Sequence, residues 1–371
     1  MQGQYCINSI KKYDGKDYQL KIAVLGFMGY HANVEIFLIR AFRKLGHDVI
    51  AIDVNNPPNK LLSIKYNNLL LSLPTIRHSY RKYYLEKISN YTVSFLLEQK
   101  PDLIITHNDA KLTPDAIKLI RAKLNVPFVS IVADDPTLAI YMPEYLPLIP
   151  HFTHLVVPES NFESRLRNLT HQEIIFTPFG VDSSVYFSTE QDDPMYTHLK
   201  SEIGYVSNSY RGAPFGLYRG LLLKHLSHLG LKIYGDAGWN YIANYIPEIK
   251  QNIHITGYLN SFAMNAFYNQ TMICPNIVNP QIVNGVAQRV LDAACAGCFQ
   301  IVEYKSDLDI IFQKEEIISF KNISELVEKT QWYLSHPLER DEKRLSAQKK
   351  VVENYGWDKI LNEVINRVFS N

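Results

Sequence analysis

The segment around Gly285 has the residue types and spacing best suited to binding a phosphate. A helical pattern follows Asn284 and ends at Gly297, before a buried strand. The first turn of a helix presents N–H groups that have no partner within the helix, and it carries the positive end of the helix dipole. We therefore expect the N–H groups of Gly285, Val286 and Ala287 to bind a phosphate.

Three charged side chains could complete such a site. Asp292 lies two turns beyond Gly285, so its carboxylate can accept hydrogen bonds from a vicinal diol, such as that of a ribose, beside the phosphate. Arg289 could bind the phosphate or form a helical ion pair with Asp292. Arg211 follows another predicted strand, and a guanidinium there could bind a phosphate.

Polar groups also stand at predicted strand ends in the N-terminal half. His107 ends one strand, and Asp134 and Asp135 follow the next, so one of the three could be a general base or a sugar ligand. The alternative is that the aspartates cap the turn made by Pro136. We expect no metal ion, because the diphosphate already has a helix terminus.

Two glycines, Gly26 and Gly29, follow the first predicted strand, and Asp53 ends the second. An acidic residue at that place binds the ribose of a dinucleotide in many α/β proteins. The glycine spacing is G-x-x-G and not G-x-G-x-x-G, which disfavours NAD. We therefore expect no cofactor.

Short apolar runs alternate with helical patterns along the chain, which is typical of βαβ units with a parallel sheet. The runs cover 21–26, 48–53, 102–107, 127–133, 154–158 and 173–178, and then 203–208, 231–235, 253–257, 271–275 and 299–304. This predicts an α/β chain with two Rossmann-like doubly wound domains facing a central cleft. Ligands of such folds bind at the carboxyl ends of the strands, where the polar residues above lie.

Domain boundaries follow from the polar stretch STEQDDP at 188–194, which interrupts the pattern. We expect a first domain over 1–187, a linker over 188–200 and a second domain over 201–355. The final helix, 356–371, has a broad apolar stripe that must be buried on another part of the chain.

Composition excludes several classes of protein. The 371 residues include 38 basic and 37 acidic ones, so no net field favours nucleic acid. No apolar run is long enough to span a membrane and no signal-peptide layout opens the chain, so we expect a cytoplasmic protein. The segment 75–91 mixes basic residues with tyrosines; it could contact an anionic membrane surface, or be a solvated face over an aromatic core.

Residues 284–304 resemble the donor-binding helix of the group 1 glycosyltransferases, and more closely the CgeB-like branch, through N-G-V, R-V and A-C-G elements. Similar segments follow the same order elsewhere in the C-terminal half: YVSNSYRG (205–212), YGDAGW (234–239), ICPN (273–276), DLDIIF (307–312) and WYLSHPLER (332–340). The N-terminal half is similar only through GFMGYH (26–31), ADDP (133–136) and PFGVD (178–182).

The resemblance implies the GT-B architecture, with the last helix packed on the N-terminal domain. It places Asp292 where the family's second Glu holds the nucleotide ribose, and Asn284 at the first Glu, which removes a negative charge from the sugar site. Arg211 stands at the family's diphosphate-binding Lys. The loops containing Gly235, Gly238 and Tyr258 would approach the base and its ribose. The resemblance also implies a nucleotide sugar as co-substrate, with residues 1–187 on the acceptor side and residues 201–355 binding the nucleotide sugar. Gly29 would lie in a loop that approaches the donor phosphates or the acceptor.

The predicted function is transfer of a sugar from a UDP-type donor to an acceptor glycan, protein or small molecule, with retention as the resemblance implies. A nucleotide-sugar 2-epimerase shares the architecture and remains an alternative. A non-catalytic nucleotide-binding protein is a third interpretation, supported by Asn284 in place of the family's Glu.

Overall fold

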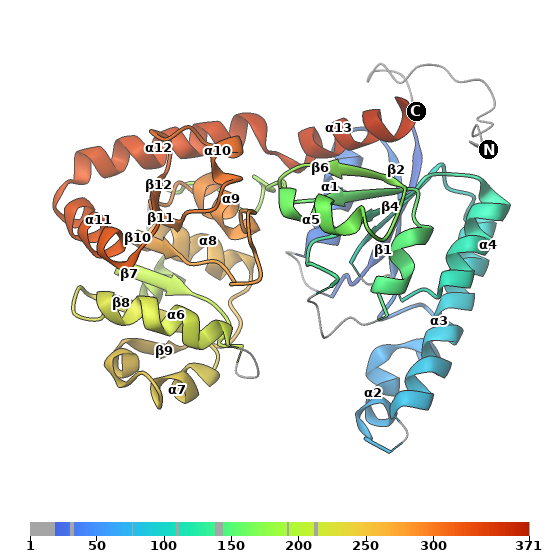
Figure 1. Cartoon of the computed structure of the whole chain (residues 1–371), viewed down its shortest axis with the longest axis horizontal. Coiled ribbons are helices and arrows are strands. Elements are labelled where there is room, and N and C mark those ends of the chain that lie inside the picture. The colour runs from blue at the N-terminus through green and yellow to red at the C-terminus, as the bar shows by residue number, and fades with distance from the viewer. Residues whose placement is uncertain are drawn as a thin grey trace. The chain divides into compact units, whose positions relative to one another are not determined.

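The computed structural model of the chain describes residues 19–29, 33–75, 77–108, 111–137, 144–190, 193–210 and 214–370. The chain divides into two compact units (Figure 1). Unit 1 runs to Thr177 and resumes at Trp357, and unit 2 is the continuous segment Pro178–Gly356.

Unit 1 is built on a parallel six-stranded sheet in the order β2-β1-β3-β4-β5-β6. Its strands are β1 (Lys21–Gly26), β2 (Asp48–Asp53), β3 (Leu103–His107), β4 (Phe128–Ile131), β5 (His154–Val157) and β6 (Glu173–Phe176). The runs predicted at 21–26 and 48–53 coincide with β1 and β2. Residues of β1, β3 and β4 are buried almost throughout, as expected of central parallel strands.

Helices surround this sheet. They are α1 (Val34–Lys44), α2 (Ile64–Ser72), α3 (Arg77–Gln99), α4 (Pro114–Leu124), α5 (Ser160–Leu166) and α13 (Trp357–Ser370), with 3₁₀ turns η1 (Lys60–Leu62) and η2 (Leu146–His151). Figure 1 shows α2 and the first part of α3 extending away from the sheet of unit 1.

The last helix, α13, returns to unit 1, as predicted for the GT-B architecture. Its apolar stripe, which includes Leu361, Val364 and Ile365, is buried, and α13 contacts α1. Lys44 of α1 forms a 2.7 Å ion pair with Asp358. The chain therefore completes unit 1 with its final helix.

Unit 2 holds a second parallel six-stranded sheet, in the order β12-β11-β10-β7-β8-β9. Its strands are β7 (Ser201–Val206), β8 (Leu231–Gly235), β9 (Ile253–Ile255), β10 (Thr271–Asn276), β11 (Gln300–Glu303) and β12 (Ile318–Phe320). The order reverses between β7 and β10, and ligands of open α/β sheets bind beyond the strand ends at such a point.

The helices of unit 2 connect these strands. They are η3 (Pro194–Leu199), α6 (Phe215–Leu223), η4 (Lys224–Leu226), α7 (Gly238–Ala243), η5 (Pro247–Asn252), α8 (Ser261–Gln270), α9 (Gln288–Cys295), α10 (Leu308–Ile311), α11 (Ile323–Ser335) and α12 (Pro337–Asn354). Over the described ranges of the chain, no helix is both long and apolar enough to cross a membrane.

The two sheets confirm the predicted doubly wound α/β fold. The division of the chain falls before the linker predicted at 188–200, because the residues after Thr177 pack on unit 2. The amide of Phe187 donates to Asn265 Oδ1 at 3.0 Å, and that of Thr189 donates to Asn269 Oδ1 at 2.8 Å. Both partners lie on α8.

Candidate functional site

A cavity of 250 Å³ lies in unit 2 at the carboxyl ends of β7 and β8. It is lined by Val206, Ser207, Asn208, Tyr210, Gly235, Gly257, Tyr258, Leu259, Met264, Tyr268 and Arg289. Three of the residues predicted from the sequence, Gly235, Tyr258 and Arg289, thus line one cavity.

Arg289 brings a positive charge to the wall of this cavity. It lies in the first turn of α9 and is half-buried, and its Nη1 donates to the carbonyl oxygen of Val206 at 3.3 Å. The ion pairs among the described residues do not include one between Arg289 and Asp292. The guanidinium therefore faces the end of β7 rather than its neighbour on the helix, which favours the phosphate-binding interpretation over the helical ion pair.

A second arginine, Arg219 of α6, forms hydrogen bonds with the loop after β7. Its side chain is fully buried, and its Nη1 donates to Ser207 Oγ and to the Asn208 carbonyl at 3.3 and 3.2 Å. Its Nη2 donates to Asn279 Oδ1, and its Nε has no partner. Burial lowers the pKa of this guanidinium. Sequence reasoning missed Arg219, since an arginine within FGLYRGLLL gives no sign of its burial.

Asp236 fixes the same loop from β8. Its carboxylate accepts three hydrogen bonds of 2.7 Å, from the amide and hydroxyl of Ser209 and from the amide of Gly238. Burial acts to raise the pKa of Asp236, but these donors outweigh it and the pKa is lowered. Gly238 was predicted near the ribose. In the structure its amide binds the Asp236 carboxylate in this turn, and Gly238 does not line the cavity.

Gly235 is required by close packing at the end of β8. A Cβ atom there would lie 2.2 Å from the carbonyl oxygen of Ser207. Trp239 Nε1 donates to the same oxygen at 2.8 Å, and the Trp239 ring is fully buried, as a core residue would be. Tyr258 is 63% exposed and follows Gly257, whose φ of +69° allows the turn after β9.

The start of α9 differs from the prediction. Ala287 is the N-cap residue with extended backbone (ψ 139°), so the helix begins at Gln288, beyond the three residues expected to open it. Gly285, Val286 and Ala287 therefore approach the helix instead of forming its first turn. Asn284 is half-buried, and its carbonyl oxygen accepts a 3.0 Å hydrogen bond from the amide of Asp307. The N–H groups without an intrahelical partner begin at α9 itself.

Asp292 is buried on α9, with 7% of its surface exposed. Its Oδ1 atom has no hydrogen-bond partner. Burial raises the pKa of the Asp292 carboxyl well above its usual value, and the nearby Asp182 carboxylate adds to the rise. A buried carboxyl with an unpartnered oxygen is costly, so it needs a compensating donor.

Asp292 is not among the residues that line the cavity, although it lies on the same helix as Arg289. Its charge, after burial itself, raises the pKa of Tyr268, which does line the cavity. Burial and Asp292 also raise the pKa of Tyr186, and they raise the pKa of Cys295 to about 12. Asp292 therefore lies close to Tyr268, which lines the cavity. Arg211, the predicted diphosphate ligand, lies outside the described residues.

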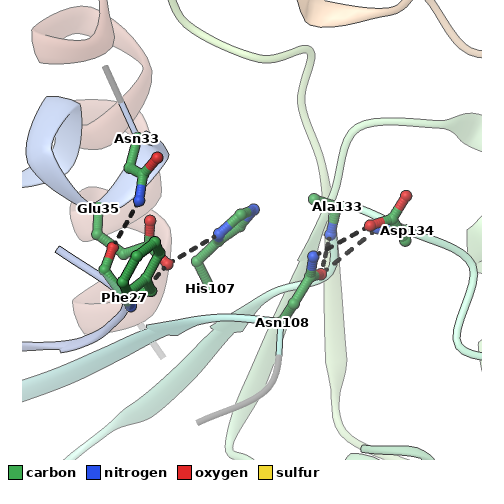
Figure 2. A network of polar contacts seen from close by, with 7 residues as sticks. All are labelled: Phe27, Asn33, Glu35, His107, Asn108, Ala133 and Asp134. Carbon is green, nitrogen blue, oxygen red and sulfur yellow. Dashed lines mark hydrogen bonds and ion pairs between the residues drawn. The ribbon is translucent and has the colours of Figure 1, made fainter. Parts of the chain in front are cut away.

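A polar network in unit 1 joins residues from the ends of β1 and β3 (Figure 2). His107 Nδ1 lies 3.2 Å from Glu35 Oε1, which also accepts from the amide of Phe27 at 3.3 Å. Asn33 Nδ2 donates to the Phe27 carbonyl at 2.9 Å. The Nε2 atom of His107 is buried and has no partner. Figure 2 shows this nitrogen on the side of the ring away from Glu35.

Glu35 is the part of this network that sequence reasoning missed. It is buried in the first turn of α1, and a Cβ on Gly26 would lie 2.5 Å from its Cγ, so the glycine leaves room for the carboxylate. A carboxylate that orients an imidazole leaves the second ring nitrogen positioned toward a ligand. The sequence feature that could have indicated Glu35 is an acidic residue in the first turn of the helix after the first strand.

The two aspartates after β4 have different environments. Asp134 accepts from Asn108 Nδ2 at 3.3 Å and is half-buried. Asp135 is buried, with one oxygen bound by the amide and hydroxyl of Thr137 and the other by Arg165. Its carboxylate is fully engaged, which favours the capping interpretation for Asp135 and leaves Asp134 and His107 as the candidate ligands.

Gly29 is described, but the three residues after it are not, so its loop cannot be followed further. Within the described parts of the chain, no group of three or more His, Cys, Asp or Glu side chains is placed to hold a metal ion. Cys274, Cys295 and Cys298 are buried free thiols.

Residues 219–366, which include α9 and most of unit 2, match the family model described as glycosyl transferase-like. This match spans about two fifths of the chain, and through this region the chain is similar to the group 1 glycosyltransferases. No curated protein matches the chain.

Several solved structures match nearly the whole chain. Sucrose-phosphate synthase from Thermosynechococcus elongatus has a TM-score of 0.67 at 12% identity, over 95% of this chain and 100% of that one. Anabaena HepE, solved with UDP-glucose, has a TM-score of 0.66 at 12% identity over the same shares. A putative UDP-N-acetylglucosamine 2-epimerase from Listeria monocytogenes has a TM-score of 0.56 at 11% identity, over 94% of this chain and 95% of that one.

These likenesses establish the GT-B fold of the chain. At identities of 11–12%, these structural likenesses concern the fold alone. The similar structures include both transferases and a putative epimerase. The functional conclusion therefore depends on the residues of the site.

Proposed function

We propose that this protein is a glycosyltransferase that takes a sugar from a UDP-linked donor bound by unit 2, and that it belongs to the CgeB-like branch of the group 1 superfamily. One observation carries the proposal: α9 presents the Arg289 guanidinium at the wall of the 250 Å³ cavity and keeps a buried Asp292 oxygen without a partner one turn further along. A phosphate and a ribose diol supply the complementary charge and donors.

Each part of the donor has a candidate partner in this scheme. The cavity between Gly235 and Tyr258 takes the nucleoside, the Asp292 carboxylate accepts from the ribose hydroxyls, and Arg289 binds the diphosphate. Arg219, beneath the Ser207–Asn208 loop, adds positive potential without touching the ligand. The HepE structures, solved in complex with UDP-glucose and with UDP, support a UDP-linked donor.

The reaction breaks the bond between the anomeric carbon and the phosphate oxygen, and the electron pair leaves with the diphosphate. Arg289 and Arg211 would stabilise this charge more in the transition state than in the ground state. The acceptor oxygen bonds to the same carbon, and its proton passes to the leaving phosphate. This route retains the anomeric configuration and requires neither a protein base nor a metal ion.

His107 has a positioning role in this scheme. Glu35 holds its Nδ1, so Nε2 can form a hydrogen bond with a hydroxyl of the acceptor or of the donor sugar. If His107 removed the acceptor proton instead, the product would have the inverted configuration. NMR of the purified glycoside distinguishes the two cases, and an inverted product would refute retention.

Ligand binding is the first test of the proposal. In a thermal-shift panel of nucleotides and nucleotide sugars, a ligand at 100 times its Kd stabilises the protein by about 2.7 kcal/mol. We expect uridine nucleotides to give the largest shift. Arg289→Ala should lose this shift. Arg340→Ala, at an α12 residue that does not line the cavity, is the matched control and should keep it.

Turnover separates the alternatives. A transferase releases free nucleoside diphosphate in proportion to glycoside, whereas a 2-epimerase returns the intact nucleotide sugar with a new configuration at one carbon. A binding protein does neither. Donor that binds and stays unchanged with a broad panel of glycan, peptide and small-molecule acceptors would contradict the transferase proposal.

A further inference from the structure

An arm of unit 1 combines exposed leucines with basic residues. We define the basic arm as residues 60–75 and 79–87, which comprise η1, α2 and part of α3. Leu61, Leu69, Leu70 and Leu73 are 63, 72, 37 and 41% exposed, and Tyr83 is 53% exposed. Single exposed leucines are normal on protein surfaces, but four within thirteen residues form a patch that needs an explanation.

The charge of the arm differs from that of the rest of the chain. It has five basic residues and one acidic residue, Glu86, which leaves 33 of the 38 basic and 36 of the 37 acidic residues to the remainder. Lys65, Lys82 and Lys87 are exposed. Arg81 is the exception, because Glu144 binds it at 2.5 Å. The cations therefore surround the leucines without being neutralised by neighbouring acids of the arm.

Packing explains why the patch stays outside the core. Several polar contacts hold the arm together: Asn67 Nδ2 donates to the carbonyls of Leu61 and Ser63 at 2.8 Å, and Tyr84 donates to the Leu62 carbonyl at 2.9 Å. These contacts fix η1 and α2 on α3, and they leave the leucine side chains facing outward. Figure 1 shows α2 and the first part of α3 extending away from the sheet of unit 1.

We propose that the basic arm binds the surface of a membrane that contains anionic lipids. Apolar side chains of such elements enter the boundary between headgroups and acyl chains, while lysines extend their charge to the lipid phosphates. The charge of the patch selects this occupant over a second copy of the chain, because two identical basic arms would repel each other. The inference does not depend on the proposed sugar transfer.

Vesicle co-sedimentation of the full chain tests the proposal. We expect binding to phosphatidylcholine vesicles that contain phosphatidylglycerol, and little binding to phosphatidylcholine alone. Lys65→Gln and Lys82→Gln should each weaken binding about fivefold, since a cation near an anionic surface contributes about 1 kcal/mol. Leu69→Ser and Leu73→Ser should each weaken it about tenfold, because apolar burial is lost.

Matched controls lie on α12, where Leu338 is 81% exposed and Lys349 is exposed. Leu338→Ser and Lys349→Gln should leave vesicle binding unchanged. Circular dichroism checks that all variants fold. The proposal is overturned if the chain does not bind anionic vesicles, if the leucine variants bind as the parent does, or if the leucines instead mediate dimers or capture of a protein in the absence of lipid.

Discussion

Asn at position 292 should make the protein more stable at neutral pH while weakening its binding of UDP. Burial raises the pKa of the Asp292 carboxyl above its usual value of 3.8, so the folded state binds more protons than the unfolded chain above that pH. The free energy of unfolding of the parent therefore falls as pH rises from 3.8 towards the raised pKa. Asp292→Asn has no such titration and escapes this loss.

The size of the stability difference follows from the single proton that Asp292 binds. The stability of Asp292→Asn relative to the parent should increase with pH by at most about 1.4 kcal/mol per pH unit, and it should level off above the raised pKa. In the complex, hydrogen bonds to a charged acceptor contribute about 1.5–3 kcal/mol and those to a neutral one about 0.5–1.5 kcal/mol. Asn should therefore bind UDP about five- to tenfold more weakly, and Asp292→Ala about ten- to hundredfold.

Urea unfolding of parent and variant across pH 4 to 8 measures the stability difference, and calorimetry with UDP over the same range measures affinity. The titration of UDP itself cancels in the difference between the two proteins. A stability difference that does not change with pH would show that burial does not raise the pKa of Asp292. Equal UDP affinity of the parent and the Ala variant would remove Asp292 from the donor site.

Four further predictions test other parts of the molecule. His107→Gln should lower kcat/KM about ten- to hundredfold, through the loss of one hydrogen bond, and calorimetry should show unchanged UDP affinity. Glu35→Gln should do the same, and the double variant should be no worse than either single variant. Glu35→Asp should keep part of the activity that Glu35→Gln loses. Arg289→Ala should weaken UDP more than uridine, and equal losses would exclude a diphosphate contact. Gly235→Ala should abolish nucleotide-induced thermal shifts, because its Cβ would lie 2.2 Å from a carbonyl oxygen. Leu361→Ala, at a 1% exposed position of α13, should cost about 2–5 kcal/mol of unfolding free energy, and a loss well below that in urea melts would contradict its burial.

Strand prediction from the sequence succeeded where apolar runs are long and bounded by helical patterns. All eleven predicted runs correspond to strands, because a parallel strand buried on both faces leaves a continuous apolar segment. β12 was missed, since three residues, Ile318–Phe320, are too few to show any periodicity. The return of α13 to unit 1 was inferable from its stripe together with the family resemblance.

The sequence predicted those residues of the candidate site that lie near the ends of strands. Gly235, Tyr258 and Arg289 were brought to one cavity, as strand topology requires. Arg219 and Glu35 were missed because burial of a charge is a tertiary property that local sequence does not record. The start of α9 was placed too early, since Gly285 suggested a helix opening that the extended backbone of Ala287 moves to Gln288.

The return of α13 also has a consequence for biosynthesis. Unit 2 is one continuous segment, whereas unit 1 needs its final helix, Trp357–Ser370, to cover α1. Domains usually fold in the order of their synthesis. Here unit 1 begins before unit 2 in the chain but is completed after it, so part of its apolar surface stays uncovered until residues 357–370 have been made. A nascent chain stalled before Trp357 should therefore hold a protease-resistant unit 2 and a protease-sensitive unit 1, and chaperones should be needed mainly by the half made first.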